Sequence, residues 1–291
     1  MLVTLKDSLV HAEKENKAVG AFNVPNYETL RAVIHGAEEL NVPVIIQHAE
    51  VHENLMSLSE IGPMMIAMAK KAKVPVAVHL DHGSSFEKCM EAIRLGFTSV
   101  MYDASDKPFA QNLAETKEIV KIAHAVDVSV EAELGSIYTS VIGGGEGRVE
   151  RTAEELKPEN MYTDPKLAKE FVTETGIDCL AIAFGAVHGL YLTKPQLDLK
   201  RISQIKQEID LPFVMHGGSG VSAENYAVAI NSGIRKINYY TYMNQAGGRE
   251  LVNYLGSQEA NQPPFFDTLS LVAYEGMKRN VKEALVIFNQ L

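Results

Sequence analysis

A short apolar segment followed by a segment of helical periodicity recurs eight times along these 291 residues, and this repeat constrains the fold most strongly. Helical patterns such as Tyr27–Leu40 lie between the apolar segments. Parallel strands must be joined by covering crossover segments. We therefore predict an α/β fold in which eight strands close into a (β/α)8 TIM barrel. The expected strands begin at Ala18, Pro43, Pro75, Ser99, Ser129, Cys179, Pro212 and Lys236.

The repeat continues without a linker, so residues 1–291 are expected to form a single barrel domain. The segment 136–163 is long, glycine-rich and charged. We interpret it as a mobile loop over the active site. The segment from Leu269 to Phe288 has an apolar face and is expected to be a C-terminal helix that packs on the barrel or on a partner.

Charge and apolar patterning exclude several classes of protein. A formal net charge of −10 disfavours nucleic acid and anionic membrane surfaces as partners. No run reaches the roughly 18 consecutive apolar residues of a spanning helix, and the first twenty residues do not resemble a secretory signal. Cys89 and Cys179 are far apart, as expected of buried reduced thiols. We expect a cytoplasmic protein.

Polar side chains gather where the expected strands end, and barrels of this type carry their catalytic groups there. Few polar residues lie elsewhere in the strands, so we expect apolar layers to fill the rest of the interior. Asp81 and His82 are adjacent, and strict alternation would direct them to opposite faces. At least one of the two must leave the regular strand. The residues at strand ends are Asn23, Asp81, His82, Asp103, Glu133, His188, His216 and Asn238.

Three of these residues, His82, His188 and His216, each precede a glycine. Catalytic zinc takes three protein ligands and keeps one open position, and it favours imidazole nitrogen. These histidines therefore form a candidate zinc site, although a single histidine at a strand end can equally bond a loop carbonyl. His48 and His52 are rival ligands. His79 is expected to support the site from below or to fill the core.

A glycine-rich turn follows the seventh expected strand and runs into a helix capped by Ser222. Backbone N–H groups and a helix N-terminus can hold an anion, and many barrels seat a phosphate between the loops after strands 7 and 8. We predict a phosphate seat here, whereas a plain turn is the simpler interpretation. The residues concerned are Gly217, Gly218, Ser219, Gly220, Asn238 and Thr241.

Taken together, these motifs resemble the class II fructose-bisphosphate and tagatose-bisphosphate aldolases, and the resemblance covers nearly the whole chain in the right order. It implies zinc-dependent, reversible cleavage of a ketose 1,6-bisphosphate or ketose 1-phosphate to dihydroxyacetone phosphate and an aldehyde. The motifs that carry it are FNVPNYET, HLDHGSS, SVMYDAS, VEAELG, GGGEG, GAVHGLY, MHGGSG and KINYYT.

The resemblance also implies roles. His82, His188 and His216 would hold Zn²⁺, while Asp81 would protonate the aldehyde oxygen during condensation. Glu146, in the loop, would take a proton from dihydroxyacetone phosphate. Asp103 and Glu133 would hold the metal in an alternative position. A monovalent cation (Na⁺ or K⁺) often assists in the family, whose members tend to be homodimers or homotetramers. Expected substrate contacts are Asn23, Gly189, Gly217, Gly218, Ser219, Asn238, Tyr240 and Thr241.

Three departures bear on the substrate. Ala49 and Thr268 stand where bisphosphate-specific members often carry a serine and an arginine, and the loss of a charge-assisted contact weakens the case for a second phosphate. Tyr240 and Tyr242 replace smaller or acidic residues at the eighth strand.

A Schiff-base mechanism would need a desolvated lysine inside the barrel. Lys236, at the amino end of its strand, is not expected to supply it.

Two other functions stay open. A metal-dependent hydrolase on the same barrel would use zinc to activate water, and such enzymes commonly carry a His-x-His pair on the first strand, where this chain has only Asn23. A barrel that binds a sugar phosphate without catalysis would not need Asp81 beside an open metal site. Loss of aldol-cleavage activity with chelator and its return with zinc would support the aldolase.

Overall fold

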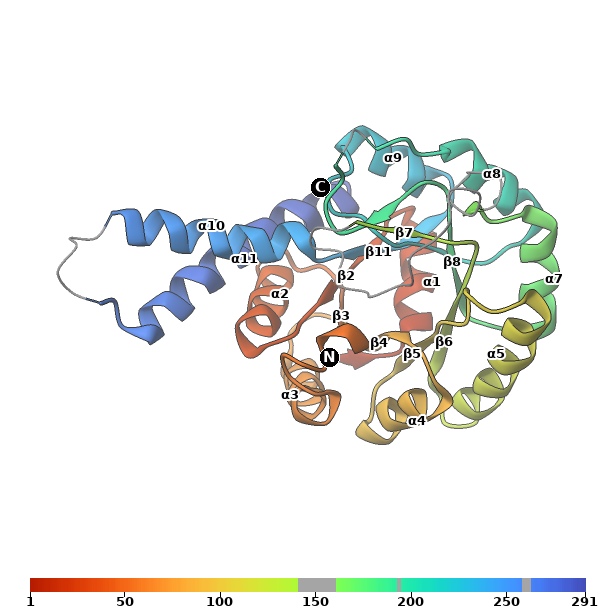
Figure 1. Ribbon diagram of the computed structural model, residues 1–291, viewed down its shortest axis with the longest axis horizontal. Coiled ribbons are helices and arrows are strands. Elements are labelled where there is room, and N and C mark those ends of the chain that lie inside the picture. Colours follow the sequence, from red (N-terminus) through yellow and green to blue (C-terminus); the bar gives the residue numbers. More distant parts are fainter. Residues whose placement is uncertain (141–160, 193–194, 258–262) are drawn as a thin grey trace.

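A computed structural model describes residues 1–140, 161–192, 195–257 and 263–291. Eight parallel strands close into a barrel, each strand bonded to the next in the order β2-β3-β4-β5-β6-β8-β10-β11 and β11 bonded back to β2 (Figure 1). The predicted (β/α)8 barrel is thereby confirmed. The strands are β2 (Val19–Asn23), β3 (Val44–Ala49), β4 (Val76–Gly83), β5 (Ser99–Tyr102), β6 (Ser129–Leu134), β8 (Cys179–Ile182), β10 (Phe213–Met215) and β11 (Ile234–Tyr239).

Helices cover the outside of the barrel and are bounded by local caps. Asn26 and Ser57 form capping boxes at the starts of α2 and α3, which supply bonds to amides that the helices themselves leave unpaired. The helices are α1 (Leu5–Glu15), α2 (Tyr27–Leu40), α3 (Leu58–Lys71), α4 (Phe86–Leu95), α5 (Phe109–His124), α7 (Pro165–Thr175), α8 (Leu199–Glu208), α9 (Ala223–Asn231), α10 (Thr241–Gly256) and α11 (Phe266–Phe288), with a 3₁₀ turn η1 (Glu50–His52).

Three further short strands flank the barrel. β1 (Leu2–Val3) pairs with the start of β4, while β7 (Tyr138–Thr139) pairs in parallel with β9 (Val187–His188). Among the residues that the structure describes, no helix is both long and apolar enough to cross a membrane.

The barrel interior is layered, and its middle layer contradicts the expectation of apolar filling. At the amino ends of the strands, Leu5 and Leu9 of α1 pack in an apolar cluster with inward residues such as Ile45 and Val214. One pleat further along the strands, Glu131 and Lys236 are fully buried. This charged layer is tolerated because its members bond to one another. The catalytic layer follows at the carboxyl ends.

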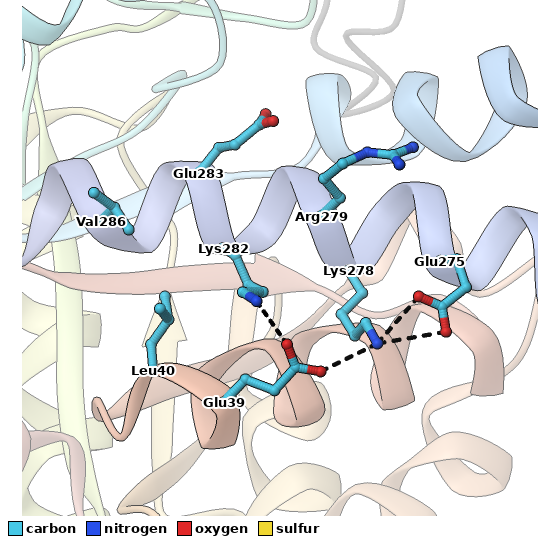
Figure 2. Close-up of a pocket in the computed structure, with 8 residues that line it drawn as sticks. All are labelled: Glu39, Leu40, Glu275, Lys278, Arg279, Lys282, Glu283 and Val286. Carbon is cyan, nitrogen blue, oxygen red and sulfur yellow. Dashed lines mark hydrogen bonds and ion pairs between the residues drawn. The ribbon is translucent and has the colours of Figure 1, made fainter.

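Helices α10 and α11 form a hairpin that extends away from the barrel (Figure 1). The predicted C-terminal helix is confirmed as α11, which buries Val281 and Leu285 in the core that it shares with α2 and β2. An open groove of ≈ 670 Å³ lies between α2 and α11 (Figure 2). Lys282 and Lys278 of this groove form ion pairs with Glu39 at 2.6 and 3.1 Å, and these pairs connect the two helices.

Candidate active site

His82, His188 and His216 converge at the carboxyl ends of the barrel strands. They come from β4, β9 and the residue after β10, and one ring nitrogen of each lies within 4.8 Å of the others. The ring centroids are 4.6 Å apart for His82 and His216, and 5.1 Å apart for His82 and His188. All three side chains are buried. The fold thus brings together three imidazoles that are separated by up to 134 residues.

Carboxylates orient two of these rings. Asp103 Oδ2 lies 2.7 Å from Nδ1 of His82, and Glu131 Oε1 lies 2.8 Å from Nε2 of His216. The remaining nitrogens, His82 Nε2 and His216 Nδ1, face each other at 2.9 Å. Metal-binding histidines characteristically bond a carboxylate through the other ring nitrogen. The donor set and its supports therefore fit a divalent ion such as zinc.

A break in β4 allows Asp81 and His82 to serve the same site. His82 has φ of +49°, in the left-handed region, and the register of β4 with β5 shifts between Leu80 and Gly83. Gly83 permits this bulge, because a Cβ there would lie 2.8 Å from the backbone oxygen of Met101. The expected departure from strict alternation thus falls on His82, at a cost of roughly 1–2 kcal/mol in backbone strain.

A second group of candidate ligands consists of His82, Asp103 and Glu133, again with ligand atoms within 4.8 Å of one another. It corresponds to the predicted alternative metal position. His48 and His52 belong to neither group found among the described residues. His48 is buried, and its Nε2 lies 3.7 Å from Glu53. These two rival ligands therefore stand apart from the cluster.

Asp81 is held by three side-chain amides. Asn23 and Gln47 donate to Oδ2 at 2.9 and 3.0 Å, while Asn238 donates to Oδ1 at 3.0 Å. Gln47 also donates to Asn23 Oδ1 at 2.9 Å. Burial by itself would raise the pKa of Asp81, but the positive charges of His82 and Lys236 outweigh it, and the pKa lies below its usual range. Asp81 is thus an ionised carboxylate that three amides hold in a fixed orientation.

The glycine-rich turn after β10 is packed tightly against its neighbours. Gly217 has φ of +63°, and a Cβ there would lie 2.8 Å from the backbone nitrogen of Val187 and closer still to its carbonyl. Only glycine lets His216 and His188 approach so closely. The N–H of Gly218 donates to the carbonyl of Asn238 at 3.0 Å, so this amide ties the turn to β11.

The remaining predicted contacts surround the start of α10. Ser219 Oγ accepts from the N–H groups of Tyr240 and Tyr242 at 3.3 and 3.4 Å and thereby caps this helix, which begins at Thr241. The ring of Tyr240 packs on His52 with centroids 4.9 Å apart. The turn and the first turn of α10 therefore meet at the edge of the site where the phosphate seat was predicted.

The backbone of His188 is fixed from both sides. Gly189, with φ of +87°, turns the chain after it, and Ser140 N–H donates to the carbonyl of His188 at 2.9 Å. Tyr138 and Thr139 pair with β9 just before. Residues 141–160, which make up most of the predicted mobile loop and include Glu146, lie outside the described residues. The candidate metal site is thus joined to residues 138–140.

Comparison with known families decides the identity of the chain. Residues 3–291 match the family model described as fructose-bisphosphate aldolase class II. The chain belongs to this family. The class II aldolase is also similar to the YdjI aldolase from Escherichia coli K12, with 35% identity, a TM-score of 0.85 and coverage of 99% of this chain and 97% of that one. The enzyme is therefore an aldolase, a carbon–carbon lyase.

The fold recurs in a more distant structure. The fructose-bisphosphate aldolase from Campylobacter jejuni shares 22% identity with this class II aldolase, with a TM-score of 0.80 and coverage of 99% of this chain and 95% of that one. At this identity the likeness shows the barrel fold alone.

Lys236 of this class II aldolase does not lie where it was expected. It is fully buried inside the barrel rather than placed at the amino end away from the site. Its Nζ lies 2.7 Å from Glu131 Oε2, so an ion pair engages the ammonium group. Alternation along β11 could have shown this, because Lys236 lies two residues before the inward Asn238. Gln47 and Glu131 were likewise missed as supports of Asp81 and His216.

Proposed function

We propose that this class II aldolase cleaves a ketose 1-phosphate or ketose 1,6-bisphosphate of the fructose or tagatose type. The products are dihydroxyacetone phosphate and an aldehyde such as glyceraldehyde 3-phosphate, and the reaction is reversible. The observation that carries the proposal is a buried three-histidine cluster beside the carboxylate of Asp81, which three amides hold in place. His82 Nε2 and Asp81 Oδ1 are 4.0 Å apart, which suits one substrate held between both.

His82, His188 and His216 would hold Zn²⁺ in this proposal, with Asp103 and Glu133 serving the alternative position. A bound zinc ion supplies a Lewis acid that draws electron density from the substrate ketone. Asp81 accepts the proton of the C4 hydroxyl during cleavage and returns it to the aldehyde oxygen during condensation. Two buried oxygens, Gln47 Oε1 and Asn238 Oδ1, find no donor in the described part of the chain and are suited to accept from substrate hydroxyls.

From the family resemblance, we assign to Glu146 the removal of a proton from C3 of dihydroxyacetone phosphate. The phosphate of that product would lie at the turn of Gly217, Gly218 and Ser219 and at the start of α10, which the bonds to Ser219 Oγ bring together. Because the Gly218 N–H bonds Asn238, Gly218 would contribute close approach of the backbone. Na⁺ or K⁺ would assist substrate binding at this place. Asn23 is bonded to Asp81 and Gln47, so we assign it to the orientation of Asp81 as well as to the substrate pocket.

The test of this function is a coupled aldol-cleavage assay on protein stripped of metal and then reloaded with zinc. Activity should disappear with chelator and return with zinc. The variant Asp81→Ala should keep its zinc content and lose turnover by about 10²–10⁴-fold. Loss of zinc from Asp81→Ala would show that acid and ligand are not separate. Phosphate release without aldol cleavage would support a hydrolase, and zinc binding without turnover would support a binding protein.

The second phosphate of the substrate is tested by comparing fructose 1,6-bisphosphate, tagatose 1,6-bisphosphate and fructose 1-phosphate. Ala49 is fully buried at the end of β3, and Thr268 lies in the first turn of α11, so neither contributes a positive charge. We expect no strong preference for either bisphosphate. A large kcat/KM advantage for one of them would show that another residue binds the second phosphate.

We also propose that the chain forms a homodimer or homotetramer through the α10–α11 hairpin. Phe265 and Phe266 are 82% and 81% exposed, and Val252 is 70% exposed on the neighbouring helix. Such a concentration of apolar surface is typical of an interface. Light scattering should show a smaller species for the variant Phe265→Ser/Phe266→Ser, but not for Leu55→Ser, an equally apolar site elsewhere. The expected cytoplasmic location stays a prediction.

A further inference from the structure

A buried ion pair lies behind His216, in the layer of the barrel below the candidate metal site. Lys236 Nζ lies 2.7 Å from Glu131 Oε2, and neither side chain has any exposed surface. The other oxygen of the same carboxylate, Oε1, lies 2.8 Å from Nε2 of His216. Glu131 therefore joins a lysine on β11 to a histidine that follows β10.

The carboxylate of Glu131 is enclosed on its other sides. His79 Nε2 lies 3.5 Å and Cys179 Sγ 3.7 Å from Oε2. His79 is itself held, because its Nδ1 lies 2.8 Å from Ser99 Oγ. Contacts from several different strands thus leave the carboxylate a single orientation. Buried charges are costly, and an apolar pair of similar volume is often at least as stable. The position of this pair behind a metal ligand suggests a role beyond stability.

We propose that Glu131, held by Lys236, is a positioning residue that selects the tautomer of His216. Oε1 accepts the Nε2–H, so Nδ1 carries the lone pair and faces His82 Nε2 across the site at 2.9 Å. Glu131 belongs to neither candidate ligand group among the described residues. The inference rests on the proposed metal site, and it assigns a task to a buried charge pair that the aldol reaction does not otherwise use.

The variant Glu131→Gln gives the sharpest test, because it preserves shape while it removes the negative charge and replaces one acceptor oxygen by an NH₂ donor. The Lys236 ammonium can bond only the amide oxygen, which leaves the amide NH₂ to donate to His216 Nε2. That donation would place the proton of His216 on Nδ1, where it blocks metal binding. We expect zinc affinity, measured by chelator competition, to fall about 10–100-fold. Adding Lys236→Met frees the amide oxygen to turn to His216 and should restore most of the affinity.

Ser99→Ala is the matched control, since it removes a buried bond of His79 and leaves Glu131 and His216 in contact. Its zinc affinity should equal that of the unaltered protein. Equal zinc affinity for Glu131→Gln and the unaltered protein would overturn the proposal. So would a double variant that binds zinc no better than Glu131→Gln alone.

A second measurement separates this inference from the proposed function. Nitrogen-15 NMR of histidine-labelled, metal-free protein reports which ring nitrogen of His216 carries the proton. We expect Nε2–H in the unaltered protein and Nδ1–H in Glu131→Gln. Nδ1–H in the unaltered protein would overturn the inference even if no variant folds. Failure of the unaltered protein to bind zinc would instead refute the proposed metal site.

Discussion

The substitution Gly217→Ala tests whether one glycine sets the distance between two candidate metal ligands. Gly217 has φ of +63°, where an L-residue costs roughly 1–2 kcal/mol. A Cβ would also lie 2.8 Å from the backbone nitrogen of Val187, beside two still closer backbone atoms. Backbone atoms cannot rotate away, so β9 must shift, and such overpacking typically costs a further 1–3 kcal/mol or so. We expect the free energy of unfolding to fall by about 2–5 kcal/mol in total.

Gly176→Ala is the matched control, because Gly176 has φ of +70° and a Cβ there would meet no atom within 4 Å. It should lose only the conformational part, roughly 1–2 kcal/mol. Urea unfolding of both metal-free variants measures the difference. Zinc affinity should fall at least about tenfold for Gly217→Ala alone, since His188 moves with Val187. Equal stabilities and unchanged zinc affinity would refute the reasoning.

Three further outcomes follow from the buried and paired groups. Burial lowers the pKa of His48 to about 4, so between pH of about 6.5 and 4 the unfolded chain binds more protons than the folded one. The free energy of unfolding should therefore fall by up to about 1.4 kcal/mol per pH unit as the pH falls through this range. His48→Gln should flatten this pH dependence, as measured by urea unfolding. Burial raises the pKa of Cys89 to about 12 and that of Cys179 well above its usual range. Both thiols should therefore resist a thiol reagent at pH 8 until urea is added. Lys282→Met should cost less than about 1 kcal/mol in thermal unfolding, because its contact with Glu39 is partly exposed.

The strand ends were predictable because a parallel barrel imposes a simple rule on them. Apolar runs with intervening helical periodicity indicated all eight strands, and Asn23 and Asp103 lie at or directly after the ends of β2 and β5, as expected. The same rule placed His82, His188 and His216 on one rim. The family resemblance was confirmed over residues 3–291. The roles taken from that resemblance stay predictions.

The interior of the barrel was predicted less well. Apolar layers were expected below the rim and Lys236 was not expected inside the barrel, whereas Glu131 and Lys236 form a buried ion pair there. Residues 105 positions apart give no local sign that they will meet. Each charge looks unfavourable by itself, and only the partner across the barrel makes its burial tolerable.

The sequence by itself determined the number and order of the βα units and which side chains reach the catalytic rim, because both depend on local periodicity and on strand direction. Only the tertiary structure decided which nitrogens of His82 and His216 face each other, how three amides hold Asp81, and which carboxylate supports His216. These arrangements depend on distances between distant strands of a closed barrel, which local sequence patterns do not encode.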